Sequence, residues 1–91
     1  MPDQLTQEDH SLAEELAQIR DEVILKIHLG KAEMRTHWEE LETKWTLLQS
    51  RLSSVKLARD ETLTDLKAAI KQLLHELTEG YARIRESLKG L

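Results

Sequence analysis

Residues 11–55 read SLAEELAQIRDEVILKIHLGKAEMRTHWEELETKWTLLQSRLSSV, and this stretch decides the fold. Apolar residues, with one glycine among them, recur at every third or fourth position and form a stripe along one side of the predicted helix. The stripe consists of Leu12, Leu16, Ile19, Val23, Ile27, Gly30, Met34, Trp38, Leu41, Trp45, Leu48, Leu52 and Val55. This spacing is typical of an amphipathic helix, whereas a half-buried strand needs a period of two. The stretch therefore predicts one helix over about residues 12–51, capped by Ser11 with Glu14 three residues later.

A second stripe with the same spacing follows in the C-terminal third. It consists of Leu63, Leu66, Ile70, Leu73, Leu77, Tyr81, Ile84 and Leu88. Gly90 is a suitable stop, so we predict a second helix over about residues 61–89. Residues 53–60, with two serines and Asp60, are the best place for a turn. Because no Gly or Pro marks that turn, one unbroken helix is the alternative to a hairpin.

The composition agrees with helices throughout. Leu, Glu, Lys, Ala, Gln and Arg dominate, and the 91 residues include one proline and three glycines. These abundant residues are the good helix formers. We therefore predict an all-α protein. Residues 1–10 form a flexible segment, and residues 11–91 form a single domain, a long, coiled-coil-like antiparallel hairpin.

The predicted hairpin has a consequence for assembly. A turn near residue 56 places Trp38 level with Leu73–Leu77 and Gly30 close to Gly80–Tyr81. It leaves Leu12, Leu16 and Ile19 without a partner in the same chain. The uncovered part is about 15 Å long at 1.5 Å per residue. The chain has no cysteine, so no disulfide can reinforce a small core.

Pairing two hairpins into a homodimeric four-helix bundle covers this overhang. The predicted interface consists of the apolar stripes of both helices: Leu12, Leu16, Ile19, Val23, Ile27, Gly30, Met34, Trp38, Leu41, Trp45, Leu66, Ile70, Leu73, Leu77, Tyr81 and Ile84. Gly30 lies inside the predicted helix, where it costs about 1 kcal/mol relative to Ala. Close approach of a neighbouring helix, a kink, or room for Tyr81 or Trp38 can explain it, and we favour close packing over a tolerated defect.

Candidate ligand sites are few. Glu33, His37 and Glu40 lie on one helical ridge and can supply metal ligands if a second chain adds more. Di-iron bundles need Glu-x-x-His motifs, however, and no histidine here has Glu three residues before it. We therefore expect a solvated ridge, with no metal and no cofactor. Trp38 and Trp45 can stack on a base or a flat cofactor, but their place among leucines favours packing.

Charge and motifs exclude several activities. The net charge is −4 with acids and bases interspersed, which argues against nucleic-acid binding. The sequence has no Gly-x-Ser-x-Gly elbow and no Gly-rich phosphate loop, so we do not expect an enzyme. The first residues lack the blocks of a signal peptide, and the apolar run 23–29 is too short to span a bilayer, so we expect a cytoplasmic protein.

These observations favour a small helical-bundle interaction protein, a scaffold, adaptor or regulator that acts by self-association as a dimer. A further, unidentified protein partner stays open. The first alternative is a peripheral lipid- or hydrophobe-binding protein that uses its wide apolar face. The polar face is not rich in Lys and Arg, which argues against membrane association without excluding it. The second alternative is a metal-binding bundle that uses Glu33, His37 and Glu40 across chains.

Overall fold

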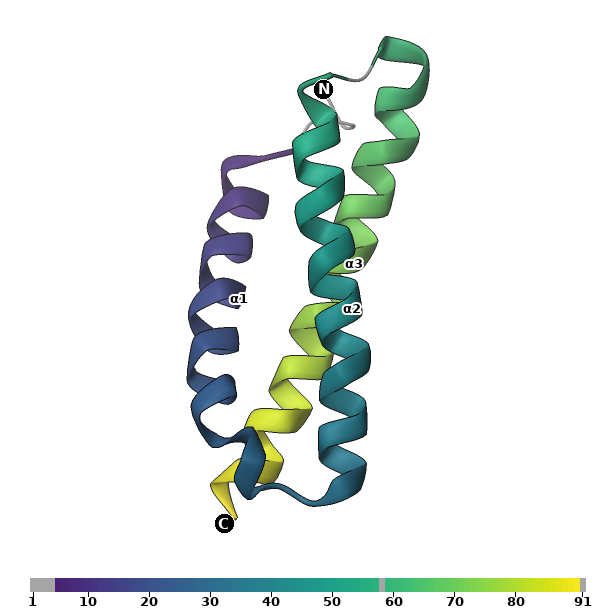
Figure 1. The fold of residues 1–91 in the computed structure, drawn as a ribbon. Coiled ribbons are helices and arrows are strands. Elements are labelled where there is room, and N and C mark those ends of the chain that lie inside the picture. The colour runs from purple at the N-terminus through teal and green to yellow at the C-terminus, as the bar shows by residue number, and fades with distance from the viewer. Residues whose placement is uncertain (1–4, 58, 91) are drawn as a thin grey trace.

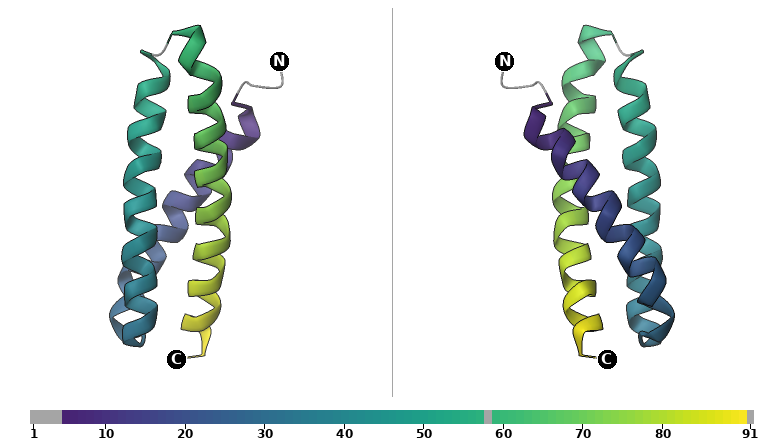
Figure 2. Two further views of the ribbon diagram at one scale, coloured as in Figure 1. Left: turned by 90° about the vertical axis from the view of Figure 1, so that its right-hand side faces the viewer. Right: turned by 90° about the vertical axis from the view of Figure 1, so that its left-hand side faces the viewer.

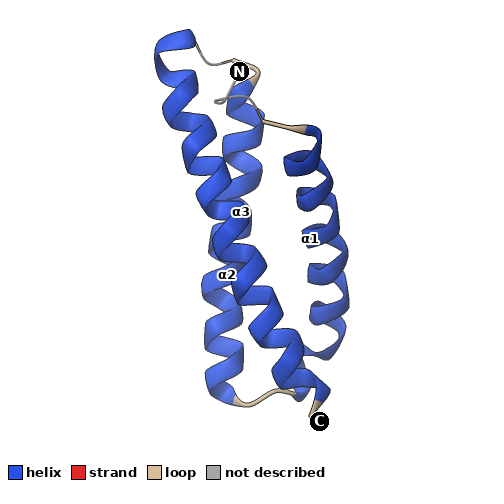
Figure 3. Ribbon diagram, turned by 180° about the vertical axis from the view of Figure 1, so that it is seen from behind, coloured by secondary structure: helices blue, strands red, loops and turns tan. Residues whose placement is uncertain are grey.

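The computed structural model describes residues 5–57 and 59–90. This part of the chain contains the helices α1 (Gln7–Lys26), α2 (Ala32–Val55) and α3 (Asp60–Lys89), with one 3-10 turn, η1 (Ile27–Leu29), between α1 and α2. Only helices and short connections are seen there, so the all-α prediction is confirmed (Figure 3). None of these helices combines the length and the hydropathy that a membrane span requires.

The helices form an elongated bundle that measures 47 × 21 × 16 Å. α2 and α3 lie side by side as an antiparallel hairpin, and α1 folds back diagonally across one face of it (Figures 1 and 2). α1 therefore runs antiparallel to α2 and in the same direction as α3. The core runs along the inside of the bundle and is formed by Leu16, Val23, Trp38, Leu41, Leu48, Ile70, Leu74, Leu77, Tyr81 and Ile84.

The hairpin turn lies within the predicted segment 53–60. α2 ends at Val55, and α3 begins at Asp60 and ends at Lys89, with Gly90 as its C-cap. The predicted register, however, is wrong. Trp38 packs on Tyr81 rather than on Leu73–Leu77, and Leu41 rather than Gly30 lies against Gly80. The partners on α3 are shifted towards the C-terminus by about two helical turns, which is more than the small displacement of the chain reversal between Val55 and Asp60 accounts for.

The single helix predicted over residues 12–51 is also wrong, because the chain bends between α1 and α2. The amide of Gly30 donates to the carbonyl of Ile27 at 2.9 Å, and the backbone is extended at Gly30 (ψ 164°) and Lys31 (ψ 161°). Folding back leaves Leu16 and Val23 only 1% exposed. Burying such a side chain stabilises the fold by roughly 1.5–3 kcal/mol, and glycine is a poor helix former, so the bend is favoured.

The bend removes the overhang that the straight helix creates. Leu16 is buried in the core, and Leu12 and Ile19 pack against it, all within one chain. The expectation that these residues lack an intrachain partner is therefore wrong for this conformation. In the bent chain, therefore, Leu12, Leu16 and Ile19 leave no overhang for a second copy to cover.

The start of α1 differs from the prediction as well. Thr6, not Ser11, is the N-cap, and it forms a reciprocal capping box with Asp9: the Asp9 amide donates to Thr6 Oγ1 at 3.1 Å, and the Thr6 amide donates to Asp9 Oδ2 at 2.9 Å. A flexible segment over residues 1–10 is thus wrong for residues 7–10, which are helical, while residues 1–4 lie outside the described residues. A complete box satisfies two terminal amides and extends the helix by one turn.

Candidate interaction surface

The predicted interface residues serve the core of the single chain. Eight of them are buried: Leu16, Val23, Trp38, Leu41, Ile70, Leu77, Tyr81 and Ile84. Seven more pack against that core and are partly buried: Leu12, Ile19, Ile27, Met34, Trp45, Leu66 and Leu73. Gly30, the last of the set, is half-buried at the bend. In the bent chain these stripes therefore join α1, α2 and α3 to one another.

The aromatic residues pack inside the bundle. The rings of Trp38 and Tyr81 lie 5.4 Å apart between centroids, at 32° to each other. The Tyr81 hydroxyl is buried and has no hydrogen-bond partner among the described residues. Burial, with the nearby Glu42 carboxylate, raises the pKa of Tyr81 far above its usual range, although Arg20 opposes the shift. Trp38 is thus a packing residue, as its spacing predicts, and its ring offers no free face for a base or cofactor.

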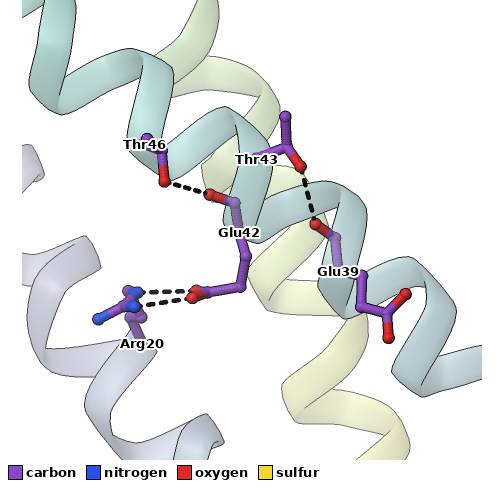
Figure 4. A network of polar contacts seen from close by, with 5 residues as sticks. All are labelled: Arg20, Glu39, Glu42, Thr43 and Thr46. Atoms are coloured by element: carbon purple, nitrogen blue, oxygen red, sulfur yellow. Dashed lines mark hydrogen bonds and ion pairs between the residues drawn. The ribbon is translucent and has the colours of Figure 1, made fainter.

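One ion pair ties α1 to α2. Arg20 donates from Nε and Nη2 to the two carboxylate oxygens of Glu42, each at 2.7 Å, and the two side chains meet in the space between the helices (Figure 4). The Arg20 guanidinium also lies 5.6 Å from the centre of the Trp45 ring. The hydrogen bonds to Glu42 raise the pKa of Arg20 further above its usual value. A bidentate pair of this kind fixes the position of one helix relative to another.

Two weaker ion pairs tie α1 to α3. Asp9 Oδ2 lies 3.3 Å from Lys71 Nζ near the start of α1, and Glu22 Oε2 lies 3.6 Å from Arg85 Nη2 near its end. All three pairs join residues that are distant in sequence, and the sequence analysis identified none of them. In the sequence, these ion pairs are indicated only by charged residues beside the apolar stripes. Such charges do not show which residue pairs with which.

The metal-ligand candidates do not converge. Among the described residues, no three His, Asp or Glu side chains gather closely enough to hold a metal ion. Glu33 and His37 line one shallow groove, and His37 and Glu40 line its neighbour, but Arg83 lies in both grooves. A guanidinium there disfavours a second cation. The ridge has the chemistry of a mixed-charge surface rather than of a metal centre.

Exposed aliphatic side chains gather at the bend. Ile24, Leu25 and Leu29, which we call the corner surface, are 42%, 74% and 59% exposed. Two other large aliphatic residues, Leu47 on α2 and Leu57 in the hairpin turn, are exposed elsewhere. Leu25 and Leu29 lie outside the stripe of residues that pack into the core.

Charged side chains of both signs surround the corner surface. Lys26 and Lys31 lie beside it in the sequence, and Glu22 and Glu33 lie within about one turn of them; all four are exposed. Lys26 also shares a shallow hollow with Arg85 and Lys89 at the end of α3. Such a surface can associate through apolar contact and through ion pairs of either sign.

Comparisons of this chain with protein-family models, with curated proteins and with solved structures found no match.

Proposed function

We propose that this chain is a helical-bundle interaction protein rather than an enzyme, and that it acts in the cytoplasm by self-association, as a scaffold, adaptor or regulator. The observation that carries the proposal is the corner surface. A short segment holds three of the five large aliphatic side chains that are exposed among the described residues. Clustering of this kind is a feature of association sites, whereas single exposed aliphatic residues are common on any protein.

The partner that fits the corner surface best is a second copy of the same chain. A two-fold contact brings each surface against itself, so apolar residues meet apolar residues. The charges around it suit the same arrangement, because Lys26 and Lys31 of one copy can face Glu22 and Glu33 of the other. The corner surface is thus self-complementary in both polarity and charge.

The test is the mass of the protein in solution as a function of concentration. We expect sedimentation to give twice the 10.6 kDa chain mass at micromolar concentration. Replacing both corner leucines, Leu25→Gln with Leu29→Gln, should leave a folded monomer. Leu57→Gln is the matched control, because Leu57 is 87% exposed but lies in the hairpin turn, at the opposite end of the bundle (Figure 1). A wild-type chain that stays monomeric at millimolar concentration contradicts the proposal.

A second candidate function is binding to an anionic lipid surface through the same corner. It is supported by the cations Lys26, Arg85 and Lys89, which line one hollow together with Glu22, the ion-pair partner of Arg85. Apolar residues flanked by basic ones are typical of interfacial membrane binding. Co-sedimentation with anionic vesicles tests this function, and Leu25→Gln with Leu29→Gln should abolish it. A chain that dimerises but does not sediment with vesicles leaves only the first candidate.

A further inference from the structure

The bend between α1 and α2 is built from residues that can also continue a helix. The stripe passes through it without a change of spacing, from Val23 to Ile27, Gly30, Met34 and Trp38 in steps of four, three, four and four. Ile27 already has helical torsions (φ −61°, ψ −29°), and the extended ψ angles are those of Gly30 and Lys31. No proline lies between residues 3 and 91 to forbid the straight form. Rotations at Gly30 and Lys31, with a smaller adjustment at Lys26 (φ −114°) and the 3-10 turn after it, therefore suffice to join α1 and α2 into one helix.

We propose that two copies of this chain exchange α1 and form a domain-swapped dimer. In this dimer residues 27–31 are helical, α1 and α2 form one helix about 75 Å long, and α1 of each copy packs on the α2–α3 hairpin of the other. The proposal rests on the self-association proposed above and adds an exchange of α1 to it.

The direction of the helices allows the exchange. α1 runs antiparallel to α2 within the bent chain (Figure 1). When two straightened chains are related by a two-fold axis at the bend, α1 of one copy is likewise antiparallel to α2 of the other. The same contacts can then form between chains: the burial of Leu16 and Val23, and the ion pairs Arg20–Glu42, Asp9–Lys71 and Glu22–Arg85.

Because those contacts are the same in the monomer and in the swapped dimer, the difference in free energy between the two comes from the residues of the bend. Straightening adds backbone hydrogen bonds there and brings the two bend segments close to the two-fold axis. Leu25 and Leu29 are four residues apart and so lie on one face of the straightened helix, roughly opposite the stripe through Val23, Ile27 and Gly30. The exchange itself therefore leaves these two leucines exposed.

Substitutions at the bend separate the two states. Lys31 has φ −68°, and Gly30 before it is extended, so a proline at position 31 fits the bent chain. The same proline lies in the middle of the straight helix, which it breaks. We expect Lys31→Pro to weaken dimerisation by more than about 100-fold while the helical content and cooperative unfolding of the monomer remain. Lys31→Ala, which removes the charge without fixing the backbone, should still dimerise.

Gly30→Ala should act in the opposite direction. Alanine favours a continuous helix by about 1 kcal/mol over glycine, and in the bent chain its Cβ displaces the flexible end of Met34. Since the dimer contains this position twice, we expect dimerisation to strengthen by about 20-fold.

A cross-link shows directly whether α1 crosses between chains. The chain has no cysteine of its own, so introduced thiols are unique. A tagged chain carrying Glu22→Cys is unfolded and refolded with an untagged chain carrying Arg85→Cys, and a short thiol cross-linker is added. The swapped dimer should give a tagged–untagged product, and the same pair with Lys31→Pro should not.

The outcomes distinguish this inference from the proposed function. A chain that dimerises equally well with Lys31→Pro, or that gives no tagged–untagged product, self-associates without exchange, which overturns the inference and keeps the proposed function. A wild-type chain and a Gly30→Ala variant that both remain monomeric at millimolar concentration overturn both.

Discussion

Gly80 shows how a single residue sets the spacing of two helices. It is buried in the middle of α3, and a Cβ on it would overlap the side-chain carbons of Leu41 on α2. The sequence analysis assigned close packing to Gly30, which instead ends a turn. Both glycines interrupt a helical pattern, and spacing along the chain cannot distinguish a glycine that admits a neighbour from one that permits a bend. That distinction depends on which residue lies opposite, and therefore on the register of α2 against α3.

Gly80→Ala should destabilise the protein by about 1–3 kcal/mol, because α2 and α3 must separate to admit the added methyl group. Gly90→Ala is the matched control, since a Cβ there meets nothing closer than Ser87 O at 3.8 Å. Urea denaturation measures both. Equal stability of the two variants would show that Gly80 and Leu41 are not in contact.

The Asp9 carboxylate gives a pH-dependent contribution to stability. The hydrogen bond from the Thr6 amide lowers the pKa of Asp9, with help from Lys71 and against partial burial. A lowered pKa in the folded state gives stability that is present above the unfolded-state pKa of about 3.9 and is lost as the pH falls through the folded-state value. Asp9→Asn should therefore lower the melting temperature at pH 6 and have little effect at pH 2. An effect of equal size at both pH values would exclude a role for the charge.

At the scale of elements, periodicity predicts helices well and their interruptions poorly. The stripe from Leu63 to Leu88 corresponds to α3, and its positions from Leu66 onwards lie in the core or pack against it. The stripe from Leu12 to Val55 is equally regular but spans α1, the bend and α2. A regular stripe indicates that its residues can share one face of a single helix. Whether they do depends on which is more favourable, burial of α1 on α3 or continuation of α1 into α2. That competition involves contacts that are distant in sequence.

The cap of α1 can be located by substitution. Thr6→Ala removes one half of the capping box and should cost about 1 kcal/mol of stability. Ser11→Ala should be neutral or slightly stabilising, because Ser11 is exposed inside α1, where alanine is the better helix former. Thermal unfolding followed by circular dichroism compares the two. A greater loss for Ser11→Ala would place the start of the helix where the sequence analysis predicted it.

At the scale of the whole molecule, the third helix makes the hairpin self-sufficient. α2 and α3 alone bury one face of each helix, and α1 covers the open face by packing Leu16 and Val23 into the same core. The two-helix description of the chain was wrong because the sequence offered no sign that α1 (Gln7–Lys26) returns onto α3 (Asp60–Lys89). The all-α class, by contrast, follows from composition and period alone.

Leu16→Ala tests whether α1 covers the hairpin in solution. Leu16 is 1% exposed, so the truncation should destabilise the protein by about 2–5 kcal/mol, a large share of the stability of a small domain. Leu25→Ala makes the same change on the same helix at a residue that is 74% exposed, and should have little effect in dilute solution. Equal tolerance of both changes would mean that α1 does not pack on α3.

The contact between Trp38 and Tyr81 gives the chain an internal optical reporter. Tyr81 is its only tyrosine, and the phenol lies against an indole, so light absorbed by the phenol passes to the tryptophan rather than being emitted. Separation of α2 from α3 should restore tyrosine fluorescence. Detachment of α1 should first change the emission of Trp45, which loses the Arg20 guanidinium above its ring. Opening at the bend and loss of the core can therefore be followed separately, without a label.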